Sequence, residues 1–530
     1  MISEVLLVST IILICILFNR FSDKYGIPLL MFFIVFGMAF GTDGLRVIEF
    51  DDYNIAKDIC TIGLIFIMFY GGFGTNWKFA KPVAVLSGVL ATLGVALTAL
   101  FTGLFCYFAL GMQKLESFLI GAVISSTDAA SVFSILKAKK LALRYNTASL
   151  LEMESGSNDP MSYLLTILAL SLMQGDYSAG LIKLFFTQIL FGVFFGVLFA
   201  LLSIHILRKA DLNKNGFDSM FVLALALLSY AVPSALDGNG YLSVYICGII
   251  LGNTPFKNKI QLVHFFDGLT GLSQILLFFM LGLLATPSAL LTIWKPAVAI
   301  ALFLTLIGRP LAVALILGPM RCPVAQNVVV ATAGIRGAAS IVFAIMATVS
   351  PATTSVDVFH IVFAVCLLSI ALQGTLLPVV SRKINMVDET SDVLKTFNDY
   401  EDATFKLLNI HLGKNHPWIG RMIRNLALAT NTLIVMIKRE GQTLIPNGNT
   451  VLKYDDNVII SGETYVDDEQ VKLEEIEVTA SHKWRGRLVK DLELPPNTLV
   501  IVIHKGNGST VIPKGDSLIE MGDTVVINRA

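Results

Sequence analysis

The stretch ESGSND (residues 154–159) lies inside an apolar segment, residues 149–173, that is long enough to cross a lipid bilayer. An ionised side chain near the centre of a membrane costs roughly 2.5–3.5 kcal/mol on insertion scales, and such groups are tolerated where they line a path for ions or protons. Another acid, Asp128, lies one apolar segment earlier in SSTDAAS (residues 125–131). Together the two segments predict the site of a cation transporter.

The composition supports a membrane protein with a soluble tail. The chain has 530 residues, of which 55% are hydrophobic and only 15% charged, and its mean hydropathy is +0.73. Its net charge of zero gives no reason to expect nucleic acid as a partner. The apolar character stops near residue 385. We therefore expect a transmembrane domain over residues 1–385, a linker over 386–400 and a soluble tail.

The apolar runs predict a polytopic α-helical membrane protein with about thirteen transmembrane helices. Loops after odd-numbered runs are basic and those after even-numbered runs are acidic or neutral. The positive-inside rule then predicts an N-terminus outside and a cytoplasmic tail. The membrane is expected to be the inner membrane of a bacterium. The runs cover residues 3–20, 27–42, 53–72, 82–110, 115–136, 149–173, 181–207, 217–236, 239–254, 264–288, 294–319, 326–349 and 357–381.

Two of these helices are expected to be interrupted. Small and hydroxylated residues break the apolar run at 125–131, and ATAGIRGAAS (residues 331–340) does the same in the twelfth run, with Arg336 in its middle. Polar, Gly-rich interruptions in the two halves of a chain point to a transporter with inverted repeats. Unwound backbone is tolerated in a membrane only where it lines a cavity or an ion site.

The helix over 149–173 brings four polar groups to one face. Glu154 and Asn158 are four residues apart, as are Ser155 and Asp159, so all four can face one cavity. Oxygen ligands of this kind suit an alkali cation. No His or Cys accompanies them, which argues against zinc or copper. A partly desolvated carboxylate can hold a proton or an alkali cation but not both, which would couple their transport.

Three further charged residues fall in or beside apolar runs. Arg336 is interpreted as the structural partner of Glu154, because an ion pair would compensate both buried charges. Arg309 and Asp267 are either members of the same polar network or residues at membrane boundaries.

The segments STDAAS, ESGSNDP and GIRGAAS resemble the signature segments of NhaP-type cation/proton antiporters, over about residues 1–385. The nearest subgroup resembles the bacterial CvrA-like potassium/proton antiporters. The resemblance implies a thirteen-helix fold with two crossed broken helices, a homodimer and electroneutral exchange. One departure is Ala129, where many relatives have proline, and it leaves the choice between K⁺ and Na⁺ open.

The resemblance also implies a role for each matching position. Asp159 would be the carboxylate that exchanges its proton for the cation, and Glu154 would pair with Arg336. The cation would be held by Asp128, Ser155 and Thr127, with Asn158 supporting the site.

Two other functional classes are less well supported by the sequence. A gated cation channel often has filter-like loops, and no TVGYG-like segment is present. A membrane enzyme could use Ser155 or Ser157 as a nucleophile, but the apolar runs offer no evident His or Lys base. We therefore expect no enzyme and no cofactor, with K⁺ or Na⁺ and H⁺ as the transported ions.

The tail contains a tandem repeat. HPWIG (416–420) recurs as HKWRG (482–486) and IPNG (445–448) recurs as IPKG (512–515). Each copy, 401–463 and 464–530, is expected to be an α+β unit with a short helix and alternating strands, at 433–438 and 458–461 in the first copy and at 499–505 and 524–528 in the second. The pattern resembles the RCK_C (TrkA-C) module of potassium-transport proteins. No GxGxxG motif accompanies it. The module would serve either dimerisation or regulation by a ligand, for which the family suggests a cyclic dinucleotide.

Overall fold

A computed structural model of the chain divides into two compact units, Met1–Asp399 and Tyr400–Ala530, and each is described by itself. The predicted first span (3–20) and most of the predicted linker (386–400) lie outside the described residues. The structure describes residues 9, 13, 29–139, 141–175, 179–209, 217–256, 259–352, 354–388, 405–413, 416–426, 428, 432–439, 442–463, 473–479, 482–492, 494, 498–505, 510–511 and 513–529.

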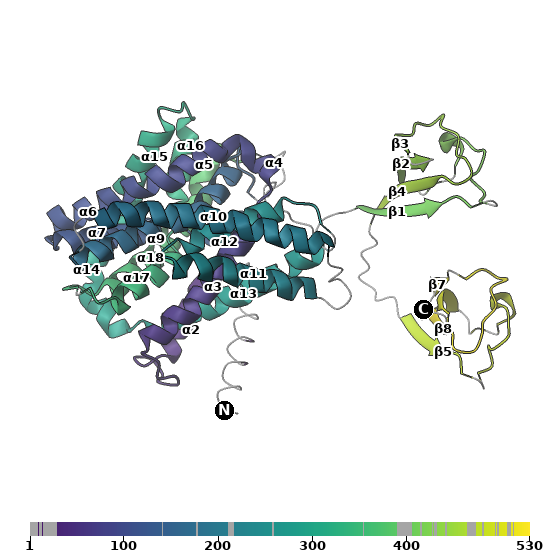
Figure 1. Ribbon diagram of the computed structural model, residues 1–530, viewed down its shortest axis with the longest axis horizontal. Coiled ribbons are helices and arrows are strands. Elements are labelled where there is room, and N and C mark those ends of the chain that lie inside the picture. Colours follow the sequence, from purple (N-terminus) through teal and green to yellow (C-terminus); the bar gives the residue numbers. More distant parts are fainter. Residues whose placement is uncertain are drawn as a thin grey trace. The chain divides into compact units, whose positions relative to one another are not determined.

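The first unit is a bundle of helices (Figure 1). Three short helical segments of other types connect α-helices that follow each other directly: the 3-10 helix η1 (Lys81–Val83) and the π-helical segments η2 (Leu90–Gly94) and η4 (Leu304–Gly308). The helices are α2 (Leu29–Phe40), α3 (Tyr53–Gly74), α4 (Trp77–Ala80), α5 (Ala84–Val89), α6 (Val95–Leu110), α7 (Lys114–Ile124), α8 (Ala129–Ala138), α9 (Thr147–Met173), α10 (Ala179–Lys209), α11 (Phe217–Ala235), α12 (Gly240–Gly252), α13 (Lys259–Leu284), α14 (Pro287–Phe303), α15 (Arg309–Leu317), α16 (Val324–Thr332), α17 (Ala338–Val349) and α18 (Val358–Lys383).

The lengths of these helices fit a multi-pass membrane protein. Within the described residues, seven helical stretches are long and apolar enough to cross a membrane, and three apolar helices are shorter. The number of thirteen spans stays a prediction. The seven stretches cover residues 53–74, 81–110, 180–209, 217–235, 259–284, 287–317 and 358–383, and the shorter ones 30–40, 240–252 and 338–349.

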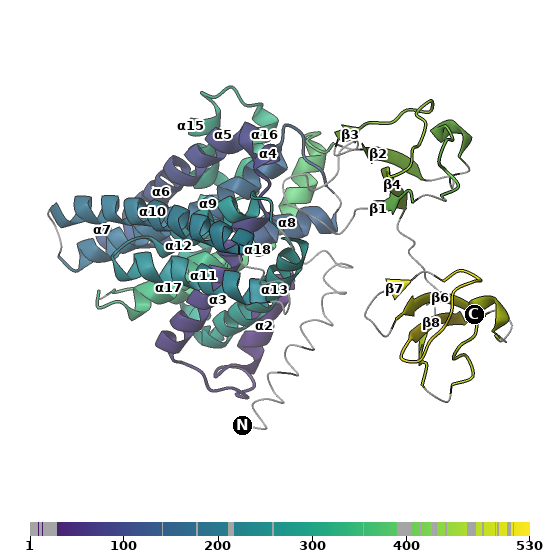
Figure 2. The same ribbon diagram turned by 45° about the vertical axis from the view of Figure 1, so that its right-hand side comes forward.

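Small residues allow α12 to pack closely along α3. A Cβ atom on Gly72 would lie 2.5 Å from the carbonyl oxygen of Tyr245, and Gly248 and Gly252 have no room for a side chain against the α3 backbone. Close approach at glycine is the usual way in which membrane helices gain packing contacts. The pair α3 and α12 therefore forms one tightly packed element, beside α13 (Figure 2).

The two predicted interruptions are confirmed. The α-helical backbone stops at Ile124 and resumes at Ala129, and it stops again at Thr332 and resumes at Ala338. The two unwound segments meet, because the backbone N–H of Asp128 donates to the carbonyl oxygen of Ile335 at 2.8 Å. Polar backbone groups that unwinding sets free thus find partners inside the bundle.

The second unit contains two four-stranded antiparallel sheets of the same topology, β1-β4-β2-β3 and β5-β8-β6-β7. Each has a bulge at the same place, between Ile434 and Met436 and between Val500 and Val502. The described part of each copy also has a short 3-10 helix, η5 (Ile423–Asn425) or η6 (Val489–Asp491). The predicted strands of the tandem repeat are therefore confirmed. The strands are β1 (Phe405–His411), β2 (Leu433–Arg439), β3 (Gln442–Leu444), β4 (Asn457–Glu463), β5 (Leu473–Glu477), β6 (Thr498–His504), β7 (Thr510–Val511) and β8 (Thr524–Arg529).

Candidate cation site

The middle of α9 carries the polar groups that the sequence singles out. Glu154, Ser155 and Asn158 are buried there, and Asp159 is partly exposed. Pro160 follows inside the helix, and its carbonyl oxygen accepts a hydrogen bond from the Asn239 side chain at 2.8 Å. The helix thus holds its acids and amides in mid-span, where the surrounding protein supplies the polar partners.

The unwound segment between α7 and α8 contacts this face of α9 through its hydroxyl groups. Ser126 Oγ donates to Asp159 Oδ1, and Asn158 Nδ2 donates to Thr127 Oγ1. The hydroxyl groups of Thr127 and Ser155 lie 3.0 Å apart. The structure therefore brings together four of the residues expected to form the site, and adds Ser126, which the sequence analysis did not select.

Asp128 lies beside the same crossing point. Its Oδ2 atom accepts hydrogen bonds from the hydroxyl group of Ser131 and, at 3.3 Å, from the Ser131 backbone N–H. Its side chain lies against Gly337 of the second unwound segment, where an added Cβ would collide with the Asp128 side chain. Asp128 is therefore held at the point where the two interrupted helices cross.

The ion pair of Glu154 differs from the expected one. Among the residues that the structure describes, Glu154 pairs with Arg309 at the start of α15, and not with Arg336. Both side chains are fully buried. Gly334 makes room, because an added Cβ would lie only 3.1 Å from Arg309 Cγ and Nε. Of the two interpretations of Arg309, its burial at the first position of α15 supports membership of the polar network over a place at the membrane boundary.

Arg336 instead forms hydrogen bonds with the backbone at the end of α7. Its guanidinium donates to the carbonyl oxygens of Ser125 and Ser126, at 2.7 Å each, and its backbone N–H donates to Ser369 Oγ at 2.9 Å. Carbonyl groups at the C-terminal end of a helix carry partial negative charge, which a cation stabilises. Arg336 thus replaces the hydrogen bonds that α7 loses where it ends inside the bundle. The structural ion pair assigned to Glu154 and Arg336 is corrected on this ground.

Asp267 is not part of this network of contacts. It accepts a hydrogen bond from the hydroxyl group of Tyr70 at 3.0 Å and so connects α13 with α3. Ser369, by contrast, touches the second unwound segment through Arg336 and also donates to Gln373 Oε1 at 2.5 Å. No signal in the sequence separates Ser126 and Ser369 from other serines, because their roles depend on where the broken helices cross.

These features define a class of protein: a multi-pass helical secondary transporter whose polar centre lies where two interrupted helices meet a third. Residues 8–383 match the family model "Sodium/hydrogen exchanger, transmembrane", and residues 408–464 and 473–527 match the TrkA-C domain. The chain belongs to the sodium/hydrogen exchanger family. It is therefore a cation/proton antiporter rather than an enzyme, and its tail carries two TrkA-C domains.

Curated relatives cover most of the chain. The K(+)/H(+) antiporter NhaP of Alkalimonas amylolytica is 32% identical over 463 residues, which are 86% of this chain and 80% of the relative. The K(+)/H(+) antiporter NhaP2 of Shewanella sp. strain ANA-3 is 32% identical over 458 residues, 85% of this chain and 79% of the relative.

A solved structure has the same fold. The sodium proton antiporter MjNhaP1 of Methanocaldococcus jannaschii superposes with a TM-score of 0.63 at 23% identity, over 72% of this chain and 99% of that structure. At this level of identity the likeness concerns the fold alone.

Proposed function

We propose that this protein exchanges K⁺ for H⁺ across the membrane. The similarity to two K(+)/H(+) antiporters extends over more than four fifths of the chain and therefore includes part of the tail. TrkA-C domains on the same chain agree with a potassium system. The finer choice of ion rests on this similarity and not on the chemistry of the site.

Asp159 is proposed as the group that binds the proton and the cation in turn. The observation that carries this proposal is the hydrogen bond from Ser126 Oγ to Asp159 Oδ1. It connects the acid on the continuous helix α9 to a segment whose backbone is already unwound. The proton-bound and cation-bound states of Asp159 would therefore favour different positions of this segment, which is what alternating access requires.

Neighbouring oxygen atoms would complete the cation site. Asp128, Ser155 and Thr127 offer carboxylate and hydroxyl oxygens of the hard type that alkali ions prefer. Asn158 Oδ1 is buried and has no hydrogen-bond partner within the described residues, because the amide nitrogen is the atom that meets Thr127. This oxygen is a further candidate ligand.

The exchange is proposed to be electroneutral. The charge of Glu154 is neutralised by Arg309, and the charge of Arg336 is stabilised by hydrogen bonds to two backbone carbonyl groups. Neither group therefore needs to change its protonation in the cycle. Asp159 alone would then exchange one proton for one monovalent cation.

The proposed setting is the inner membrane of a bacterium, with the N-terminus outside, the tail in the cytoplasm and two copies of the chain forming a homodimer. The charges of the predicted loops support this orientation. Cysteines introduced into the loops and labelled from one side of the membrane would test it.

Na⁺/H⁺ exchange is the alternative. The family description and the name of the superposed Methanocaldococcus structure both refer to sodium. Proteoliposomes containing a pH dye separate the two: addition of K⁺ or Na⁺ should release protons, and K⁺ should act at the lower concentration. A response to Na⁺ alone would overturn the choice of ion and keep the antiporter, whereas a passive current without proton movement would indicate a channel.

The tail is proposed to regulate transport by binding a nucleotide, with a cyclic dinucleotide as the candidate. The second TrkA-C domain has an open cavity of about 560 Å³ whose lining includes Arg485, a cation that could contact phosphate groups. Lys505 also lines the cavity, but it is paired there with Asp523 and Glu520. Calorimetry of the full chain with a cyclic dinucleotide should give heat that Arg485→Ala abolishes. Arg487→Ala is the control, since Arg487 is exposed and does not line the cavity. An absence of heat for the unmodified chain would refute the idea.

A further inference from the structure

A cavity of about 400 Å³ opens in the helix bundle at the end where α9 and α17 finish and α3 begins. The helix α18 begins near this end, soon after α17 finishes, and crosses the bundle. Its last residue therefore lies at the opposite end. Three polar side chains lie in the cavity wall: Lys57 of α3, Gln174 directly after α9 and Ser350 directly after α17. The cavity thus has polar groups in its wall near one end of these helices.

The cavity lies on the same face of α9 as the proposed exchange residue. Asp159, Tyr163, Ile167, Leu170 and Gln174 follow one another at spacings of four, four, three and four residues, which is one stripe of a helix. The last three of them line the cavity. From Asp159 to Ile167 the helix rises about 12 Å at 1.5 Å per residue. Tyr163 stands between the two.

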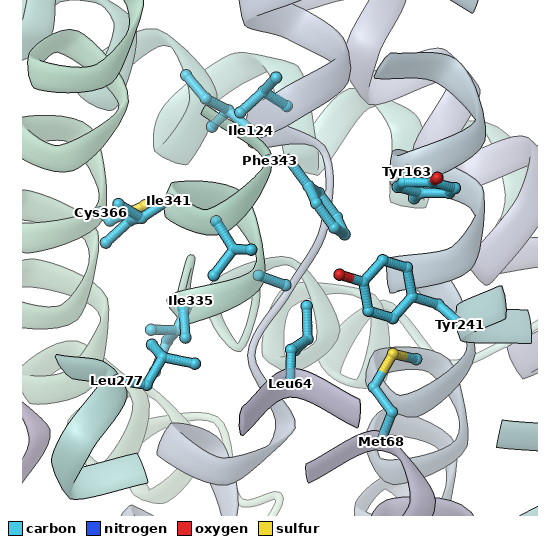
Figure 3. Packing of buried hydrophobic residues seen from close by; sticks show 14 of the residues in the cluster. Leu64, Met68, Ile124, Tyr163, Tyr241, Leu277, Ile335, Ile341, Phe343 and Cys366 are labelled. Atoms are coloured by element: carbon cyan, nitrogen blue, oxygen red, sulfur yellow. The ribbon is translucent and has the colours of Figure 1, made fainter. Parts of the chain in front are cut away.

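Two other helices around the cavity, α17 and α3, also have residues that extend from the cavity wall towards the level of Tyr163. On α17, Phe343 is followed by Met346 and Val349, both of which line the cavity. On α3, a stripe runs from Lys57 in the cavity wall to Leu64 and Met68. Leu64 and Met68 lie beside Tyr241 in Figure 3. The rows of residues on α9, α17 and α3 therefore meet in one layer of side chains between the cavity and Asp159.

Three aromatic rings fill this layer. The ring centroids of Tyr163 and Tyr241 are 5.1 Å apart, and each is 5.8 Å from that of Phe343. Figure 3 shows the three side chains facing one another. Tyr241 and Phe343 are fully buried and Tyr163 is 9% exposed. Rings packed at these distances leave no path between them for a hydrated ion.

We propose that the cavity is the vestibule through which ions reach Asp159 from one side of the membrane, and that Tyr163, Tyr241 and Phe343 form the seal that closes it in this conformation. Tyr163 and Phe343 belong to α9 and α17, whereas Tyr241 belongs to α12, which packs along α3. The seal is therefore made between two groups of helices. It opens when α9 and α17 move away from the pair α3 and α12.

The inference rests on the proposed role of Asp159, so its test does not depend on transport. In a chain whose native cysteines are replaced by alanine, Asp159→Cys and Ile167→Cys serve as reporters for a thiol reagent that cannot cross membranes. Applied from the cavity side, the reagent should modify Ile167→Cys rapidly and Asp159→Cys slowly. Because the contacts between rings stabilise the closed state, Phe343→Ala should speed modification of Asp159→Cys roughly tenfold.

The matched control is Phe73→Ala, which removes an equally buried ring that stacks on Phe69 in α3, outside the seal. It should leave the rate at Asp159→Cys unchanged. If Phe343→Ala does not fold, Phe343→Leu removes the ring at a smaller change in volume. Equal rates at the two reporters with the seal intact, or no acceleration on removing the ring, would overturn the seal. Retained exchange in Asp159→Asn would instead overturn the proposed function and leave the labelling result standing.

Discussion

The backbone N–H of Asp128 donates to the carbonyl oxygen of Ile335 at 2.8 Å. This bond ties the unwound segment after α7 to the unwound segment after α16, although more than two hundred residues separate them. Each segment therefore satisfies part of the other's backbone, and a rearrangement of either one alone would break this bond. The polar centre is therefore one structural unit to which both halves of the chain contribute an unwound segment.

Gly337→Ala should disrupt this crossing. A Cβ at this position would lie 2.3 Å from Cβ and 2.5 Å from Cγ of Asp128, so the Asp128 side chain would have to move. We expect loss of exchange and a lower melting temperature in detergent. Gly71→Ala is the matched control, because no atom lies within 4 Å of its added Cβ. Full activity of Gly337→Ala would mean that the two segments separate readily.

Asp159→Asn should abolish cation-induced proton release while the protein stays folded, because the amide cannot take up or release a proton. The measurement is the pH-dye assay in proteoliposomes, with size-exclusion chromatography to check the fold. Asp267→Asn is the control acid in the same domain, since Asp267 contacts Tyr70 away from the site, and it should keep exchanging. Proton-coupled exchange by Asp159→Asn would remove Asp159 from the mechanism.

Arg309→Met should destabilise the membrane domain strongly, because it leaves the buried carboxylate of Glu154 without its partner. Breaking a buried ion pair on one side costs about 3–5 kcal/mol. Replacing both partners, as in Glu154→Gln with Arg309→Met, removes the uncompensated charge and should recover most of the loss. Thermal unfolding of the three proteins measures both effects. Equal melting temperatures for the single variant and the unmodified chain would contradict a structural role of this pair.

Much of the architecture follows from local patterns in the sequence. The interruptions at 125–131 and 331–340 are visible because polar residues in an apolar run are costly unless they line a cavity. The tail strands are visible because the repeat presents the same alternation twice. Both predictions depend only on residues that are neighbours in the chain.

The partners of the buried arginines could not be predicted from residues that are neighbours in the chain. Arg309 and Arg336 both lie in the second half of the chain, and either could neutralise Glu154 as far as charge is concerned. The choice depends on the crossing at Asp128 and Ile335, which points Arg336 at the end of α7. A contact decided by the meeting of distant helices leaves no local signal.

The tail offers a prediction about pH, because both TrkA-C domains contain an ion pair with a buried aspartate at the same place. Arg439 at the end of β2 donates twice to Asp456, at 2.7 Å each, and Lys505, which directly follows β6, lies 2.8 Å from Asp523. Burial by itself raises the pKa of Asp456, but hydrogen bonds from Arg439 and from the Lys453 backbone outweigh it and hold that pKa below its usual value.

A carboxyl group whose pKa is lowered by folding stabilises the folded state above its unfolded pKa, near 4, and loses that contribution as the pH falls through its folded pKa. Unfolding of the first TrkA-C domain by urea should therefore become easier below about pH 4. Asp456→Asn should cost about 2 kcal/mol at pH 7, as expected for hydrogen bonds to a charged group, and should flatten the pH dependence. Trp418 fluorescence, with the other tryptophans replaced by phenylalanine, reports on this domain in the full chain. Asp455→Asn is the control, because Asp455 lies at an exposed neighbouring position. It should leave the free energy of unfolding at pH 7 and its pH dependence unchanged. If the acid transition persists unaltered in Asp456→Asn, another group causes it.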